Sequence, residues 1–195
     1  MDYHFRSRAK IAALEGRDGF VVMDVRGDLQ ALDVADLKRK LEAGDPFFEG
    51  NPFVDSALQG EPRLADIQKL SVFMSPLSRE EIRFLRESAG DPALPRLVTD
   101  VMRRKRLRRT RKQKSELSLK DLENIETRAS SAYGELKMAH PFDAVLPNHD
   151  GEDSDHWDAF YFPLGDARKS LTAFVSLLRG ERPDWAETWE ADLLP

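Results

Sequence analysis

The chain has 195 residues, of which 41% are hydrophobic and 33% charged, and this balance is typical of a globular protein with a substantial core. It contains no cysteine, which excludes a disulfide framework and a thiolate metal site. The formal net charge of −5 argues weakly against a general nucleic-acid binder. Since there is no hydrophobic leader and no apolar run of membrane-spanning length, we expect a cytoplasmic protein without membrane association.

The first half of the chain predicts helices alternating with strands. A short helix is expected over residues 8–14 and a longer one over 33–43. The β-branched run 19–25 predicts a buried strand. The aromatic run 46–53 is compatible with a short strand that turns sharply near its end.

The second half continues the alternation. Apolar runs at 69–76 and 142–148 predict two further buried strands, and the polar stretch 93–138 between them is strongly helical. An amphipathic helix is expected over 165–180, with four apolar residues on one face: Leu171, Phe174, Val175 and Leu178. The tail 184–195 either docks through its two tryptophans or frays.

Two capping boxes mark helix starts in this half. Ser78 precedes Glu81 by three residues, which predicts a helix that begins there. Ser118 and Asp121 repeat the pattern and predict a break in the long helical stretch just before Ser118.

Short apolar strands alternating with helices predict an α/β fold with a parallel sheet. In such sheets, ligands bind at the carboxyl ends of the strands. The residues of interest therefore follow Val25, Phe48, Met74 and Leu146.

Two acidic residues stand at expected strand ends, Asp24 and Glu49. A carboxylate in such a place can hold Mg²⁺ through water or accept hydrogen bonds from a substrate base. It can equally cap the next turn, and the sequence leaves both roles open.

A dense basic run occupies residues 103–114. Arginines of this kind can neutralise phosphoryl oxygens of a nucleotide or contact a nucleic-acid backbone. The same run can also form a solvated helix face, or pair with the acidic loop near residues 150–158. The four histidines match no H-E-x-x-H pattern, and a metal site at His149 and His156 is the less favoured interpretation.

The order of several segments resembles that of the guanylate kinases. DYHFRSR (2–8) matches the family's D-Y-H-F-x-S-R stretch, and VFMSPLSREEI (72–82) matches its strand and P-x-S-x-E-E-L helix. Residues 125–148 resemble the lid exit and the F-D-x-V-V-x-N strand. RGDLQA (26–31) stands where G-N-x-Y-G is expected, and FFEGN (47–51) where the family has an acid-ended strand.

The resemblance implies a P-loop NTPase-like, nucleoside-monophosphate kinase fold, in which a parallel sheet carries helices on both faces. The guanylate kinase-like domain is expected to cover residues 1–183, with an acceptor-nucleotide region at about 1–45 and a lid at about 93–138. Residues 184–195 would form a C-terminal tail.

The resemblance also implies site residues. Tyr3 is similar to the tyrosine near the GMP phosphate, and Glu49 to the acid near guanine and metal. Arg128 looks like the lid arginine that reaches the transferring phosphoryl group. Asn148 resembles the asparagine beside the ATP base.

Further candidates stand where the family pattern is altered. Asp24 is the acid nearest to the guanine-reading position, and Gln30 replaces the second tyrosine of the turn. Positive charge from the lid would come from one or more of three arginines of the basic run: Arg104, Arg108 and Arg111.

The family reaction transfers the γ-phosphoryl group of ATP to GMP or a related nucleoside monophosphate, with Mg²⁺. A P-loop needs G-x-x-x-x-G-K-S/T, and in this chain no glycine is followed by lysine, so the first strand and P-loop are absent. We expect either a reading frame that begins too late, which the loss of a sheet strand favours, or a non-catalytic relative.

Little or no kinase activity is therefore predicted for the chain. Two alternatives remain: a non-catalytic binding module for a phosphorylated or acidic partner, and nucleic-acid binding through residues 103–114.

Overall fold

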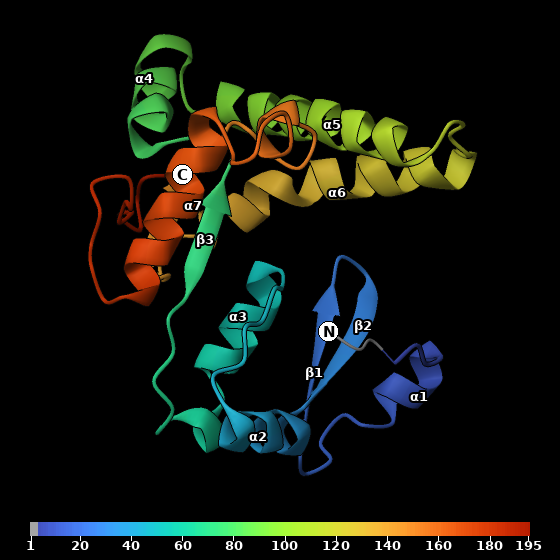
Figure 1. Ribbon diagram of the computed structural model, residues 1–195. Helices are drawn as coiled ribbons and strands as arrows, with labels where there is room; N and C mark the ends of the chain where they lie inside the picture. The colour runs from blue at the N-terminus through green and yellow to red at the C-terminus, as the bar shows by residue number, and fades with distance from the viewer. Residues whose placement is uncertain (1–3) are drawn as a thin grey trace. The chain divides into compact units, whose positions relative to one another are not determined.

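The computed structural model describes residues 4–195, which form two compact units divided between Lys69 and Leu70 (Figure 1). The expected α/β class is confirmed, because helices accompany one parallel strand pair and one antiparallel pair. Among the described residues, no helix is long and apolar enough to cross a membrane. Tyr3 lies outside the described residues.

The first unit is built around a β-hairpin. β1 (Phe20–Val25) pairs antiparallel with β2 (Asp28–Asp33) across a two-residue turn. The turn residues Arg26 and Gly27 have φ angles of 57° and 88°, the positive values that a tight hairpin of this twist requires. The expected strand is therefore present, but it belongs to a half-buried hairpin and not to a parallel sheet.

Three α-helices and a short 3-10 helix accompany the hairpin within residues 4–69: α1 (Arg8–Ala12), α2 (Val34–Ala43), α3 (Pro52–Gln59) and η1 (Pro62–Leu64). The strand expected over 46–53 is wrong, because this stretch contains a helix start. The Asn51 side chain accepts a hydrogen bond from the Val54 amide at 3.2 Å, and Pro52 fits the first helical position.

The second unit contains the parallel pair, β3 (Val72–Ser75) and β4 (Ala144–Pro147). The C-terminal tail closes the free side of β4, where Val145 and Glu187 exchange two backbone hydrogen bonds of 2.9 Å. Trp189 is 4% exposed, so the tail docks through this tryptophan and does not fray.

Both capping boxes are confirmed. The first begins α4 (Arg79–Ala89), and the second begins α6 (Leu119–Lys137). The latter runs side by side with α5 (Ala93–Gln113), and together they form a long helical hairpin (Figure 1).

The last helix, α7 (Gly165–Leu178), is present as expected, but it buries a different face. Leu171 and Leu178 are exposed, whereas the buried residues are small: Ala167, Ser170 and Ala173. Small side chains allow the helix backbone to approach β4 closely, and the Ser170 hydroxyl donates to the Pro147 carbonyl at 3.0 Å.

A hydrophobic core joins α4, α5, α6, β4 and the tail. Its buried members are Leu77, Ile82, Leu94, Val98, Ala132, Leu136, Ala139, Val145, Trp189, Leu193 and Leu194. This core fixes the carboxyl ends of the two parallel strands, where the polar residues of the second unit gather.

Candidate functional site

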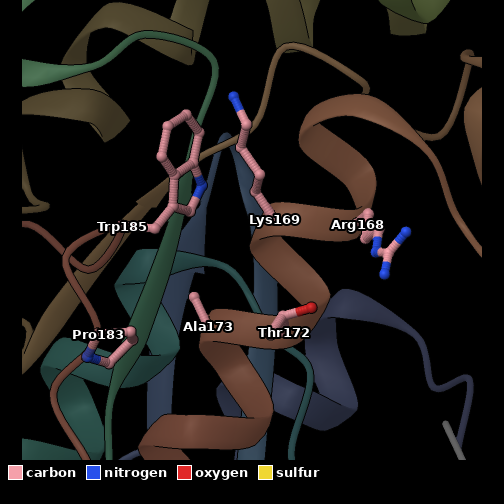
Figure 2. A pocket seen from close by; sticks show the side chains of 6 residues that line it. All are labelled: Arg168, Lys169, Thr172, Ala173, Pro183 and Trp185. Carbon is pink, nitrogen blue, oxygen red and sulfur yellow. The ribbon is translucent and has the colours of Figure 1, made fainter.

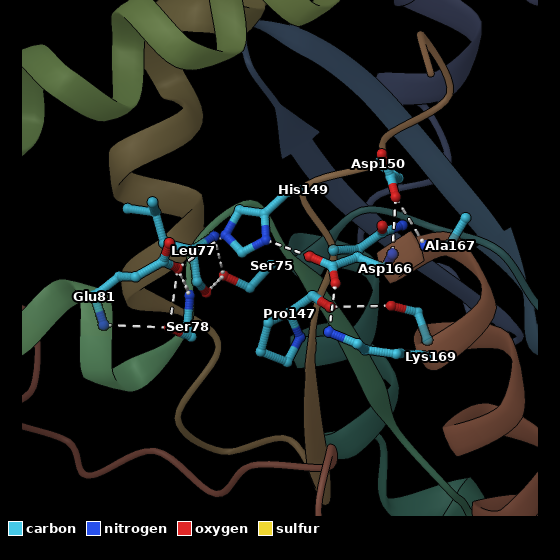
Figure 3. Close-up of polar contacts among 12 residues, drawn as sticks. Ser75, Leu77, Ser78, Glu81, Pro147, His149, Asp150, Asp166, Ala167 and Lys169 are labelled. Atoms are coloured by element: carbon cyan, nitrogen blue, oxygen red, sulfur yellow. Dashed lines mark hydrogen bonds and ion pairs between the residues drawn. The ribbon is translucent and has the colours of Figure 1, made fainter. Parts of the chain in front are cut away.

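The carboxyl ends of β3 and β4 lie at the same edge because the strands pair in parallel register, from Val72 opposite Ala144 to Ser75 opposite Pro147. The Asn148 amide extends this pairing by donating to the Ser75 carbonyl at 2.7 Å. The chain that leaves β4 then places His149 and Asp150 beside the first turns of α4 and α7 (Figure 3).

His149 lies between two carboxylates (Figure 3). Its Nε2 is 2.9 Å from Glu81 Oε2 on α4, and its Nδ1 is 2.5 Å from Asp166 Oδ2 on α7. Ionised carboxylates only accept hydrogen bonds, so this arrangement favours the imidazolium form of His149, in which both ring nitrogens donate.

The pKa of each partner changes accordingly. Burial alone lowers the pKa of His149, but hydrogen bonds to Asp166 and Glu81 outweigh it, and the net pKa is raised. Burial acts to raise the pKa of both Glu81 and Asp166. Hydrogen bonds, first from Ser78 to Glu81 and from His149 to Asp166, outweigh burial, so both pKa values are lowered.

Asp150 caps the start of α7. Its Oδ2 accepts from the backbone amides of Asp166 at 2.8 Å and Ala167 at 3.3 Å. Burial raises the pKa of Asp150, but hydrogen bonds led by that from His156 lower it to about 2. The anion-binding end of this helix is therefore already filled by a carboxylate of the chain itself.

Gly165 permits this close approach. Its φ is +54°, and a Cβ at this position would stand 2.6 Å from Asp150 Oδ2 and 2.8 Å from His156 Nδ1. Any larger residue would have to displace the capping carboxylate.

Lys105 of α5 adds a third helix to the contacts at the strand ends. Its Nζ donates to the His149 carbonyl at 2.6 Å. Burial lowers the pKa of Lys105, while the carboxylates of Asp153, Asp150 and Asp166 oppose that effect. Helices α4, α5 and α7 are thus held together by alternating charges at the strand ends.

Asn148 lies at this edge with one unsatisfied atom. The residue is 8% exposed, and its Oδ1 has no hydrogen-bond partner within residues 4–195. A buried acceptor of this kind costs free energy unless a donor reaches it.

Three cations of the basic run pair with the acidic loop, as one of the sequence alternatives proposed. Arg109 lies 2.5 Å from Glu152, Arg108 lies 3.9 Å from Asp153, and Lys112 pairs with Asp155. These pairs tie the acidic loop to α5.

Two arginines of the run and one of α6 remain unpaired. Arg104, Arg111 and Arg128 are exposed, and in the described part of the chain their side chains make no hydrogen bond or ion pair. Helical geometry puts Arg104, Arg108 and Arg111 on one side of α5. All four expected phosphate-binding arginines therefore lie on the helical hairpin.

Arg128 does not share the side of the hairpin where its helices meet. At the interface between α5 and α6, the Arg103 guanidinium donates to the Glu126 carboxylate at 2.7 and 2.8 Å. Arg128 follows Glu126 by two residues, or about 200° around α6, so it lies on a different side.

The expected acceptor residues belong to the first unit and do not share a face. Asp24 caps the hairpin turn, where its Oδ1 accepts from the Gly27 amide at 2.7 Å, so the capping role that the sequence left open is observed. Gln30 stands opposite Met23, and successive strand residues point to opposite faces, so it faces away from Asp24. Glu49 is exposed in a loop and does not end a strand.

Over residues 4–195, no group of three or more His, Asp or Glu side chains could hold a metal ion. His156 instead bonds Asp150 at 2.9 Å, and His149 is engaged as described above.

Comparisons with family models, with curated proteins and with solved structures gave no match.

Proposed function

We propose that the chain is a guanylate kinase-like domain that binds GMP or a related nucleoside monophosphate. The observation that carries the proposal is the selective pairing within the basic run. Acidic partners neutralise Arg103, Arg109 and Lys112, whereas Arg104 and Arg111 stay exposed and unpaired. A phosphate is the kind of group that such guanidinium groups bind.

The geometry of α5 suits a single phosphate group. A rise of about 1.5 Å per residue separates Arg104 and Arg111 by roughly 10 Å along the helix, with Arg108 between them. Long arginine side chains can converge on an anion placed between these positions. Arg108 has only a long contact of 3.9 Å with Asp153, so it can join them.

The carboxyl edge of the parallel strand pair is a second argument for the proposal, since ligands of α/β sheets bind at such edges. Asn148, which the resemblance implies lies beside a nucleotide base, directly follows β4 at this edge. The proposal attributes nucleotide binding to the chain, and it assigns no phosphoryl transfer because the sequence contains no G-x-x-x-x-G-K-S/T loop.

Calorimetric titration with GMP and with guanosine tests the proposal. GMP should bind saturably and guanosine much more weakly, because only GMP carries the phosphate that the arginines recognise. Equal binding of the two, or no binding of GMP, would contradict it.

A coupled assay with ATP and GMP tests the absence of transfer. We expect no turnover above background from this polypeptide. Rates typical of kinases, roughly 1–100 s⁻¹, would overturn that expectation.

A further inference from the structure

A shallow groove on the second unit combines cations with an apolar floor (Figure 2). It has a volume of about 270 Å³ and is lined by Arg168, Lys169, Thr172, Ala173, Pro183 and Trp185. We call these six residues the α7 groove. None of them is among the nucleotide-site residues described above.

The aromatic part of the groove is held in place. The Trp185 indole Nε1 donates to the Pro147 carbonyl at 3.0 Å, and the Lys169 ammonium lies 4.4 Å from the centre of the Trp185 ring. Lys169 also pairs with Asp166 at 3.0 Å. Because the indole ring and the ammonium group are already held in place, ligand binding here costs little side-chain conformational entropy of the protein.

The other cation is available. Arg168 lies over the Phe162 ring at 4.9 Å from its centre, and no carboxylate within residues 4–195 pairs with its guanidinium. Stacking on an aromatic ring leaves the edge of the guanidinium open for a bidentate contact with a carboxylate.

An exposed aromatic cluster continues the surface beyond Arg168. Its members are Phe160, Tyr161 and Phe162, whose exposed fractions are 56%, 96% and 46%. Phe160 contacts both neighbours edge to face, with ring centres 5.5 and 5.2 Å apart. Exposed aromatic side chains beside arginine and tryptophan are typical of protein-binding surfaces.

We propose that the α7 groove and the aromatic cluster bind an extended acidic peptide of a partner protein. An acidic side chain of the peptide meets Arg168 and Lys169, and a neighbouring apolar side chain enters the groove over Ala173 and Trp185. Charge complementarity selects an anionic segment. The groove volume lies slightly below the range of roughly 300–1,000 Å³ typical of small-molecule sites, so one side chain of a longer ligand fits it better than a nucleotide.

Fluorescence anisotropy with a short labelled peptide of glutamate, leucine and serine tests this proposal. The matched peptide, with glutamine in place of glutamate, serves as the ligand control. The acidic peptide should bind saturably and the glutamine peptide should not. Failure of the acidic peptide to bind, or equal binding of both peptides, would overturn the proposal.

Variants of α7 assign the binding to the groove. Arg168→Glu should lower the affinity for the acidic peptide by at least about tenfold, the effect of losing one charge-assisted hydrogen bond. Thr172→Arg adds a cation to the groove and should raise the affinity for the acidic peptide. Arg179→Glu makes the same charge change at the end of the same helix, outside the groove, and should have little effect.

The variants also separate other occupants. If Arg179→Glu weakens binding as much as Arg168→Glu, general charge attraction explains the binding and the proposal fails. It fails too if single-stranded RNA or GMP displaces the peptide from the groove. Circular dichroism of each variant confirms that α7 remains folded.

Discussion

At the scale of single residues, His149 is the most constrained side chain of the candidate site. It bridges Glu81 on α4 and Asp166 on α7 while its carbonyl accepts from Lys105 on α5. Each of these contacts joins a separate helix to the end of β4. We therefore infer that the charged imidazole keeps the carboxyl edge in one arrangement.

Replacing His149 by glutamine should destabilise the protein by about 0.5–1 kcal/mol, as expected for partly exposed ion pairs. The raised pKa of His149 means that its contribution is complete below the unfolded value of 6.5 and is lost as the pH rises through the folded value. The lowered pKa values of Glu81 and Asp166 mean that their contribution is present above 4.5 and 3.8 and is lost as the pH falls through the folded values.

The difference in unfolding free energy between wild type and His149→Gln should therefore be largest between about pH 4.5 and 6.5. Urea denaturation across this range measures it. His140→Gln is the matched control, since His140 is exposed and outside the network. A difference that grows steadily above pH 7 would contradict the charged-imidazole account.

At the scale of elements, local signals in the sequence predicted most helices and three strands. The two capping boxes gave the starts of α4 and α6 because a serine and an acid three residues later satisfy backbone groups locally. The interval 46–53 was mistaken for a strand because its aromatic residues outweighed the Asn51–Pro52 helix start. The pairing partner of β1 was missed because the two-residue turn was not recognised.

The candidate site was only partly visible in the sequence. Glu81 could be found from its capping box, and His149 and Asp150 from their place after an expected strand. The contacts of Lys105 and Asp166 with His149 were missed, because they span 44 and 17 residues of chain and no local pattern indicates them. Arg128 was found by resemblance and the other three arginines from the basic run, but only the structure shows which of the four are unpaired.

The acidic loop should suppress nucleic-acid binding by α5. Glu152→Gln together with Asp155→Asn frees Arg109 and Lys112, so affinity for single-stranded RNA should rise. The slope of log affinity for RNA against log salt concentration should become steeper by roughly 0.7 for each new phosphate contact. Filter binding at several salt concentrations measures both.

The control removes the same charge elsewhere. Glu116→Gln with Asp158→Asn changes two exposed acids that pair with no residue of α5 in the described structure. If this control raises RNA affinity equally, net charge and not the release of α5 explains the effect.

At the scale of the whole molecule, the C-terminal tail is an integral part of the second unit. Trp189, Leu193 and Leu194 contribute to the same core as α4, α5 and α6, and Glu187 extends the pairing of β4. The tail thus supports the strand whose end carries the candidate site.

Trp189→Ala should cost about 3–5 kcal/mol, the usual penalty for removing a large buried aromatic side chain. Thermal unfolding followed by circular dichroism measures it. Leu178→Ala, at an exposed position of α7, should change the stability by less than about 0.5 kcal/mol. Equal effects of the two substitutions would show that the tail is not part of the core.

The central claim is that the unpaired arginines of the helical hairpin bind the phosphate of a nucleoside monophosphate. GMP titration of two double variants with equal charge tests it most directly. Arg104→Ala with Arg111→Ala should weaken GMP binding by at least about tenfold, the loss expected for one charge-assisted contact. Arg109→Ala with Lys112→Ala removes two cations that already have acidic partners and should leave GMP affinity nearly unchanged. Equal losses in the two variants, or unchanged GMP affinity in the first, would contradict the account.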